Sequence, residues 1–136
     1  ISDIYDIRLR IEGLAARGAA GAITPEGLDE LREAIEFQEF YLQKSDAGRI
    51  KALDSRFHEI IYENCGSVIF RDTLLPLHKK AQMIRQRSVE DRTRAENSVT
   101  EHKRIYDAVA AGDALLAEKA MTEHIGNAKK HILGEL

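Results

Sequence analysis

The sequence is poor in residues that interrupt or cross-link a chain. Its 136 residues include two prolines, one cysteine and no tryptophan. The single cysteine, Cys65, excludes an intrachain disulfide and fits a reducing compartment, so we expect a cytoplasmic protein. The sequence has no run of 18 apolar residues and no signal-peptide pattern, so we expect no transmembrane helix and no membrane partner.

The sequence also lacks an excess of basic charge. Its formal net charge is −3, from 20 lysines and arginines against 23 aspartates and glutamates. Surfaces that bind nucleic-acid phosphates usually carry clustered positive charge. This chain by itself is therefore a poor candidate for binding DNA or RNA.

Helix-forming residues, by contrast, are abundant, and apolar positions recur three and four residues apart. The pattern predicts an all-α fold, an antiparallel bundle of six to seven helices forming one domain over residues 1–136. Thr24 and Asp113 are the predicted N-caps of two helices, and Gly66 is a predicted C-cap. Pro76 predicts a kink or a broken turn. The readable helices cover residues 2–19, 24–44, 47–65, 68–87, 94–111 and 114–132.

Four polar side chains interrupt the apolar faces of three predicted helices. Asp54 and His58 are four residues apart, so they point the same way beside the apolar stripe that contains Phe57. His102 and His124 each lie within the apolar stripe of a later helix. Burial without a partner costs roughly 2–7 kcal/mol for a neutral polar group and more for a charge, and one shared metal ion would remove that cost. The alternative is that each histidine is hydrogen-bonded separately inside the core.

The remaining histidines and the known enzymatic motifs fit less well. His78 flanks its apolar stripe, and His131 lies in a last helical turn, where it would cap the helix dipole. The stretch HEIIY at 58–62 has Tyr62 where a zinc protease has its second histidine. Glu101 and Glu123 precede the two later histidines directly, so they point about 100° away from them and leave no convincing general base.

Three stretches together resemble one known family. They are DIYDIRLRIEGLAARGAA, DSRFHEIIYENCGS and TEHKRIYDAVAAGDALLAEKAMTEHI. They resemble the FadR C-terminal domain (FCD) of GntR-type bacterial transcription regulators, over essentially the whole chain and in order. The resemblance implies a dimeric, ligand-sensing regulatory domain that is not an enzyme and responds to a small organic acid. It also implies a winged helix-turn-helix domain before Ile1 that binds operator DNA.

The resemblance also implies a metal site. In the metal-binding branch of the family, the ion is held by the aspartate and histidine of a D-x-x-x-H motif and by two later histidines. Those positions are Asp54, His58, His102 and His124, the same four that the apolar faces indicate. Three nitrogens and one oxygen suit a divalent transition metal, with zinc as the leading candidate and nickel, cobalt, iron or manganese as alternatives.

Two arginines are the candidate effector-binding residues. Arg8 matches the arginine of the family's R-x-x-x-E pattern, with Glu12 as the acidic residue, and a guanidinium group suits a carboxylate ligand. An intrahelical pair with Glu12 would explain Arg8 equally well. Arg85 is a weaker candidate, with a solvated position as its alternative. Two other functions remain open: a small metal-dependent enzyme resembling a hydrolase, and a purely structural helical module.

Overall fold

The protein is all-helical over the residues that its computed structural model describes. These are residues 1–85 and 91–134, without the side chain of Arg85. The all-α prediction is confirmed, and positions 86–87 of the predicted fourth helix lie outside the described residues. The described helices are α1 (Ser2–Ala22), α2 (Pro25–Gln43), α3 (Ala47–Glu63), α4 (Val68–Arg85), α5 (Arg92–Ala110) and α6 (Ala114–Ile132).

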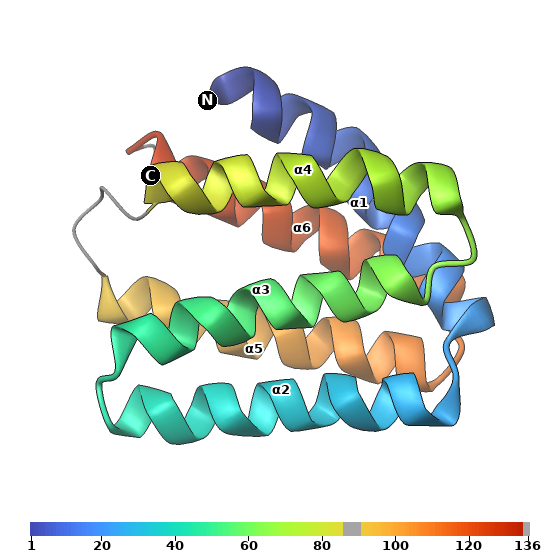
Figure 1. Ribbon diagram of the computed structural model, residues 1–136, viewed down its shortest axis with the longest axis horizontal. Helices are drawn as coiled ribbons and strands as arrows, with labels where there is room; N and C mark the ends of the chain where they lie inside the picture. Colours follow the sequence, from blue (N-terminus) through green and yellow to red (C-terminus); the bar gives the residue numbers. More distant parts are fainter. Residues whose placement is uncertain (86–90, 135–136) are drawn as a thin grey trace.

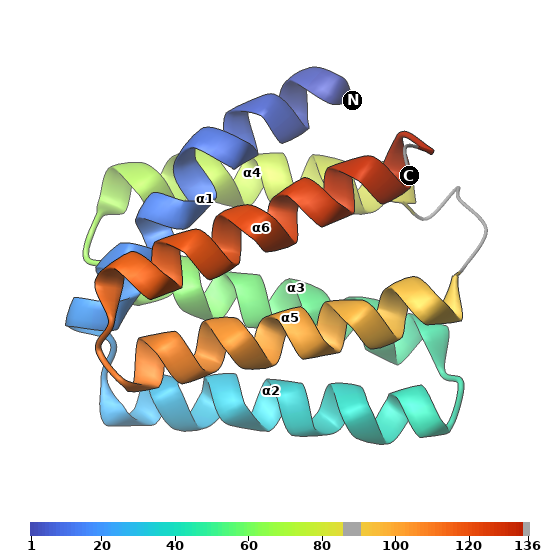
Figure 2. The same ribbon diagram turned by 180° about the vertical axis from the view of Figure 1, so that it is seen from behind.

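The six helices close into a ring in which each helix packs against the next. The order around the ring is α1, α6, α5, α2, α3 and α4, and α4 returns to α1. Figure 1 shows α3 and α4 on the near side. Figure 2 shows α5 and α6 on the opposite side, with α1 running obliquely past α6. The inward faces of all six helices therefore meet in one interior.

Side-chain caps fix several helix ends. Thr24 and Asp113 each accept a hydrogen bond from the backbone N–H three residues later, at 3.0 and 3.1 Å, so both predicted N-caps are confirmed. Helix α3 ends earlier than predicted, with Asn64 as its C-cap. Gly66 follows with a φ of 77°, a left-handed conformation that glycine adopts without strain. The chain thus turns sharply between α3 and α4.

Helix α4 continues through Pro76. The helix is unbroken from Val68 to Arg85, as Figure 1 shows, so the alternative of a broken turn is wrong. Leu74, His78 and Ala81 are all buried and therefore share the inward face of this helix.

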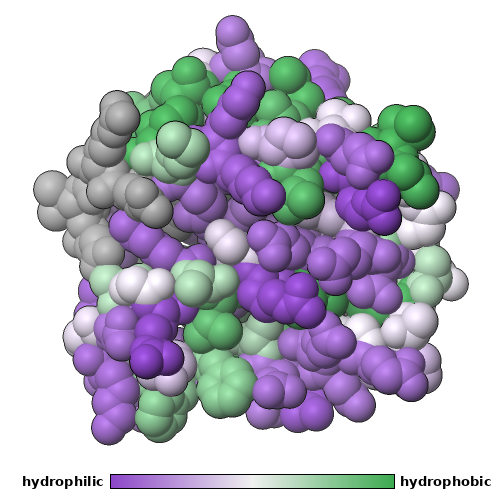
Figure 3. Space-filling view, in the orientation of Figure 1, coloured by the Kyte–Doolittle hydropathy of each residue, from purple (hydrophilic) through white to green (hydrophobic). Residues whose placement is uncertain are grey.

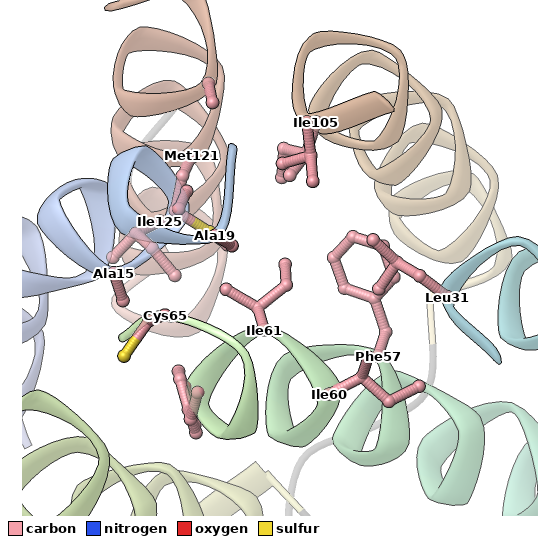
Figure 4. Close-up of a cluster of buried hydrophobic side chains, with 14 of the residues drawn as sticks. Ala15, Ala19, Leu31, Phe57, Ile60, Ile61, Cys65, Ile105, Met121 and Ile125 are labelled. Carbon is pink, nitrogen blue, oxygen red and sulfur yellow. The ribbon is translucent and has the colours of Figure 1, made fainter. Parts of the chain in front are cut away.

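The core is built from apolar side chains that different helices, α3 among them, point into the ring. In Figure 4, Phe57 and Ile61 point away from α3 toward side chains of α2, α5 and α6. Both residues are fully buried. Burying side chains of this size contributes roughly 1.5–3 kcal/mol each, which holds the inward face of α3 against the other helices. Partners labelled in the same figure are Leu31, Ile105, Met121 and Ile125.

One glycine permits a close approach of α1 to the turn after α3. A side-chain carbon at Gly18 would overlap the backbone carbonyl oxygen of Cys65. Gly21, one turn later on the same helix, has open space around it. Only the first of these two glycines is required by packing.

The surface is mainly hydrophilic on the face drawn in Figure 3, with hydrophobic side chains gathered along its upper edge over α1 and α4. Exposed apolar residues of these two helices include Ile7, Val68, Ile69 and Met83. None of the helices in residues 1–85 and 91–134 combines the length and apolar character needed to cross a bilayer.

Candidate metal centre

The four residues indicated by the sequence lie together inside the ring. The Nε2 atom of His124, on α6, lies 3.2 Å from Nε2 of His102, on α5, and 3.3 Å from Nε2 of His58, on α3. Oδ1 of Asp54, one turn before His58, lies 3.3 Å from the His102 nitrogen and 3.7 Å from the His58 nitrogen. One ligand atom from each residue lies within 4.8 Å of all the others, and all four residues are buried.

This spacing fits a transition-metal ion. Nitrogens bound at 2.0–2.1 Å to a tetrahedral zinc ion lie about 3.3–3.4 Å from one another. Four of the six separations between the donor atoms, from 3.2 to 3.7 Å, are close to that value, and all six are within 4.8 Å. The four residues could therefore hold a divalent ion.

Outer contacts decide which ring nitrogen of two histidines carries the proton. Gln38 donates its amide N–H to the carbonyl of Leu53, which leaves its oxygen to accept from Nδ1 of His102 at 2.8 Å. Nδ1 of His124 donates to Oε1 of Glu101 at 2.6 Å. With Nδ1 protonated in both rings, both Nε2 atoms present lone pairs to the centre.

Glu101 is held as a carboxylate. Burial would raise its pKa, but the hydrogen bond from His124 and two bonds from Arg94, at 2.6 and 3.0 Å, lower the pKa to about 2. Asn127 donates a further hydrogen bond to this group at 3.0 Å. Nothing in the sequence indicated this role, because Glu101 points away from His102 and contacts His124 of a neighbouring helix instead. It still lies behind His124 and is not placed to act as a base at the centre.

The two histidines beside these groups are neutral at physiological pH. Burial lowers the pKa of His124 to about 3, and burial also lowers the pKa of His102. Neutral imidazole is the form that binds metals. Two nitrogen lone pairs 3.2 Å apart cannot hydrogen-bond to each other, so the pair is unfavourable unless a cation lies between the rings.

Arg8 is engaged inside the protein. Its Nε donates to Oε2 of Glu12 at 2.6 Å, and the residue is only 3% exposed. Its Nη2 lies 3.3 Å from Nδ1 of His78. Tyr62 also donates to Oε2 of Glu12, at 2.9 Å. The intrahelical pair that was the alternative for Arg8 is thus present in the structure.

Glu12 and His58 face each other across a gap. Oε1 of Glu12 lies 3.8 Å from Nδ1 of His58, too far for a hydrogen bond, and neither atom has a hydrogen-bond partner among the described residues. Burial would raise the pKa of Glu12, but the adjacent Arg8 guanidinium leads the interactions that hold it well below the usual value. A carboxylate, that of Glu12, therefore lies on the Nδ1 side of His58, as that of Glu101 does for His124.

His78 and Gln82, on α4, are two further residues near the site that the sequence did not indicate. Gln82 donates to Oδ2 of Asp54 at 2.8 Å, and the ring of His78 lies 5.0 Å from that of His58. His78 is four residues after the buried Leu74. That periodicity was a usable signal, but the expectation of an irregular helix at Pro76 concealed it.

A cavity of about 250 Å³ leads to the candidate centre from the side of α2, α3 and α5. Asp54 and His102 belong to both the cavity wall and the candidate ligand set. His131, in the last turn of α6, lies at the cavity wall instead of among the ligands.

The prediction that Arg85 binds the effector concerns a side chain outside the described residues. The charged residues of the cavity wall are Lys51, Arg92 and Arg94 on the basic side and Asp54 and Asp91 on the acidic side.

The fold and the buried histidine–aspartate cluster define a class of helical domains that can hold an ion beside a ligand-sized cavity. The family model described as FCD domain matches residues 3–127, and the chain belongs to this family. Among solved structures, the chain is similar to Streptococcus agalactiae GntR, with a TM-score of 0.83 and 22% identity over 96% of this chain and 58% of that one. At this identity the likeness shows the shared fold.

Two curated relatives from Escherichia coli K12 are transcription repressors. The HTH-type transcriptional repressor RspR is 26% identical over 88% of this chain and 52% of its own length. The Galactonate operon transcriptional repressor is 22% identical over 97% of this chain and 57% of its own length. The chain thus spans about half the length of these relatives. Their names support the prediction of a regulatory domain that is not an enzyme.

Proposed function

We propose that this chain is the effector-sensing domain of a transcription regulator and that it holds one divalent transition-metal ion. The observation that carries the proposal is the convergence of histidine Nε2 atoms and one carboxylate oxygen at 3.2–3.7 Å. The ligands would be Asp54, His58, His102 and His124. Zinc is the leading candidate for this donor set.

The effector would be a small carboxylate bound in the 250 Å³ cavity. A divalent ion beside one aspartate leaves a formal charge of about +1 at the cavity floor, which an anion would compensate. Lys51 and Arg92 also lie in the wall, together with Asp91. Because Arg92 is paired with Glu96, the charge of the ion would be the main attraction for an anion. One relative is named for an operon of galactonate, itself a sugar acid, which agrees with this ligand class.

The regulator would act on operator DNA through a winged helix-turn-helix domain, which this negatively charged helical domain does not supply. We place that domain before Ile1. Regulators that read paired half-sites are normally two-fold symmetric, so the chain would form a homodimer. The exposed apolar residues of α4, such as Ile69 and Met83, offer a surface for it. Sedimentation of only a 15.3 kDa monomer at micromolar concentration would count against a dimer formed by this domain alone.

Metal analysis of protein purified without chelators or affinity metal tests the proposal. We expect about one ion per chain, and a melting temperature that falls on chelation and recovers on re-addition. An ion at a thousandfold excess over its dissociation constant stabilises a fold by about 4 kcal/mol. His102→Ala and His124→Ala should each remove most of this response, whereas His131→Ala should keep it. Full metal content in both ligand variants would overturn the assignment.

The carboxylate effector is tested on the same preparations. Acetate, glycolate and galactonate should raise the melting temperature of the metal-loaded domain more than the matching amides. The difference should shrink after chelation, because the positive charge of the ion is gone. Equal shifts for acids and amides, with and without metal, would leave the ion a purely structural role.

A further inference from the structure

A second, much smaller cavity also adjoins the candidate centre, with Tyr5 and Arg8 of α1 in its wall. Its volume is about 20 Å³, which holds about one water molecule. Its wall includes three of the four candidate ligands, Asp54, His58 and His124. Both cavities share Arg94 and Ser98 in their walls, so they adjoin each other around the centre.

Tyr5 lines this small cavity and carries a buried hydroxyl that forms no hydrogen bond within the described residues. The residue as a whole is fully buried. A buried polar group in a native fold normally has a hydrogen-bond partner, because a buried group without a hydrogen bond costs free energy. The hydroxyl of Tyr62 shows the usual situation, since it donates to Glu12 at 2.9 Å.

The other polar group that α1 brings to this cavity is already engaged. Arg8 also lines the small cavity, but its guanidinium is bonded to Glu12 and lies 3.3 Å from Nδ1 of His78. Its Cζ lies 5.3 Å from the centre of the Tyr5 ring, a cation–π distance that holds the ring in place. The arginine therefore positions the tyrosine, and the tyrosine retains a free donor.

We propose that Tyr5 is a specificity-determining residue of the effector site, whose hydroxyl donates a hydrogen bond to the one effector oxygen that enters the small cavity. The inference rests on the proposed function, because it places the rest of the acid in the larger cavity. A volume of about 20 Å³ admits an oxygen atom but not a whole acid. A carboxylate oxygen accepts this bond, whereas an ammonium group at the same place has no lone pair to do so.

Tyr5→Phe in the metal-loaded chain tests the assignment, with acetate as the probe because a carboxylate is its only polar group. Calorimetric titration should show acetate binding weakened by about tenfold, the size expected for losing a hydrogen bond to a charged acceptor. Metal content should be unchanged. The melting temperature without acetate should be equal or higher, because an unpartnered hydroxyl has been removed.

Tyr106→Phe is the matched control, since this tyrosine lines neither cavity. It removes the same atom and should leave acetate affinity unchanged. If Tyr5→Phe and the unmodified chain bound acetate with equal affinity, the role of Tyr5 would be overturned, but the proposed effector site would not be affected. A lower melting temperature of Tyr5→Phe without acetate would also overturn it, since the hydroxyl would then have an internal partner. Failure of acetate to bind the unmodified, metal-loaded chain would remove the carboxylate site and this inference together.

Discussion

Two glutamates precede candidate ligands directly in the sequence, and the structure gives them opposite environments. Glu101 is buried and accepts the Nδ1 proton of His124, whereas Glu123 is exposed. We expect Glu101→Gln to weaken metal affinity by about 10–100-fold, the usual effect of losing a group that orients a ligand. Competition with a chromophoric chelator measures the change.

Glu123→Gln is the control for this change, because it alters the same residue type beside the same histidine. Metal affinity should stay within about a factor of two of the unmodified chain, because an exposed charge that contacts no ligand contributes little. Similar losses in both variants would mean that general charge, and not the contact with His124, sets the affinity.

The candidate ligands were predictable from the sequence because each is a polar residue on an otherwise apolar face of a helix. Asp54 and His102 stand out by periodicity alone, without knowledge of their neighbours. Gln38 and Glu101 do not, because their contacts depend on how two helices are rotated against each other. For Arg8, the sequence left an effector contact and a pair with Glu12 open, and only the packing of α1 shows which bonds are formed.

At the level of elements, two glycines of α1 make a matched pair. Gly18→Ala should destabilise the fold by about 1–3 kcal/mol, because the added methyl group overlaps the Cys65 carbonyl. Gly21→Ala should be neutral or stabilise by up to about 1 kcal/mol, since alanine is the better helix former and nothing surrounds that position. Urea unfolding of both variants measures the difference. A Gly18→Ala variant as stable as Gly21→Ala would show that α1 does not approach the turn this closely.

The number of helices and most of their ends followed from caps and apolar periodicity. Thr24 and Asp113 were readable because a helix start needs a side-chain acceptor. The prediction for helix α4 was less accurate, because proline inside a helix usually interrupts it. In the structure, buried side chains on either side of Pro76 hold the helix together. The sequence carried no comparable signal for the closed order of the ring, which depends on contacts between distant segments.

For the whole molecule, the buried histidines make the metal-free fold sensitive to acid. The unfolded chain gains a proton on each histidine below about pH 6.5, whereas burial lowers the pKa of folded His78 and His124 to about 3. The unfolded state then binds more protons, so the free energy of unfolding falls as pH drops from about 6.5 toward 3. Each of these histidines contributes a slope of up to about 1.4 kcal/mol per pH unit.

Urea unfolding of the chelated domain between pH 7.5 and 5 measures this dependence. His78→Gln should reduce the slope, because glutamine does not titrate. A stability that stays constant over that interval would mean that these histidines are as easily protonated in the folded protein as in water.

The facing imidazole lone pairs have a consequence for how long each protein molecule survives. If the proposed metal site is correct, a chain without the ion would keep these lone pairs uncompensated and would open more often. At a thousandfold excess of the ion, the opened population falls about a thousandfold. Proteases that cleave only opened chains are slowed in the same proportion when opening is faster than cleavage. Under the proposed metal site, scarcity of the ion would therefore shorten the lifetime of the regulator, and pulse proteolysis with and without chelator would show the difference in half-life directly.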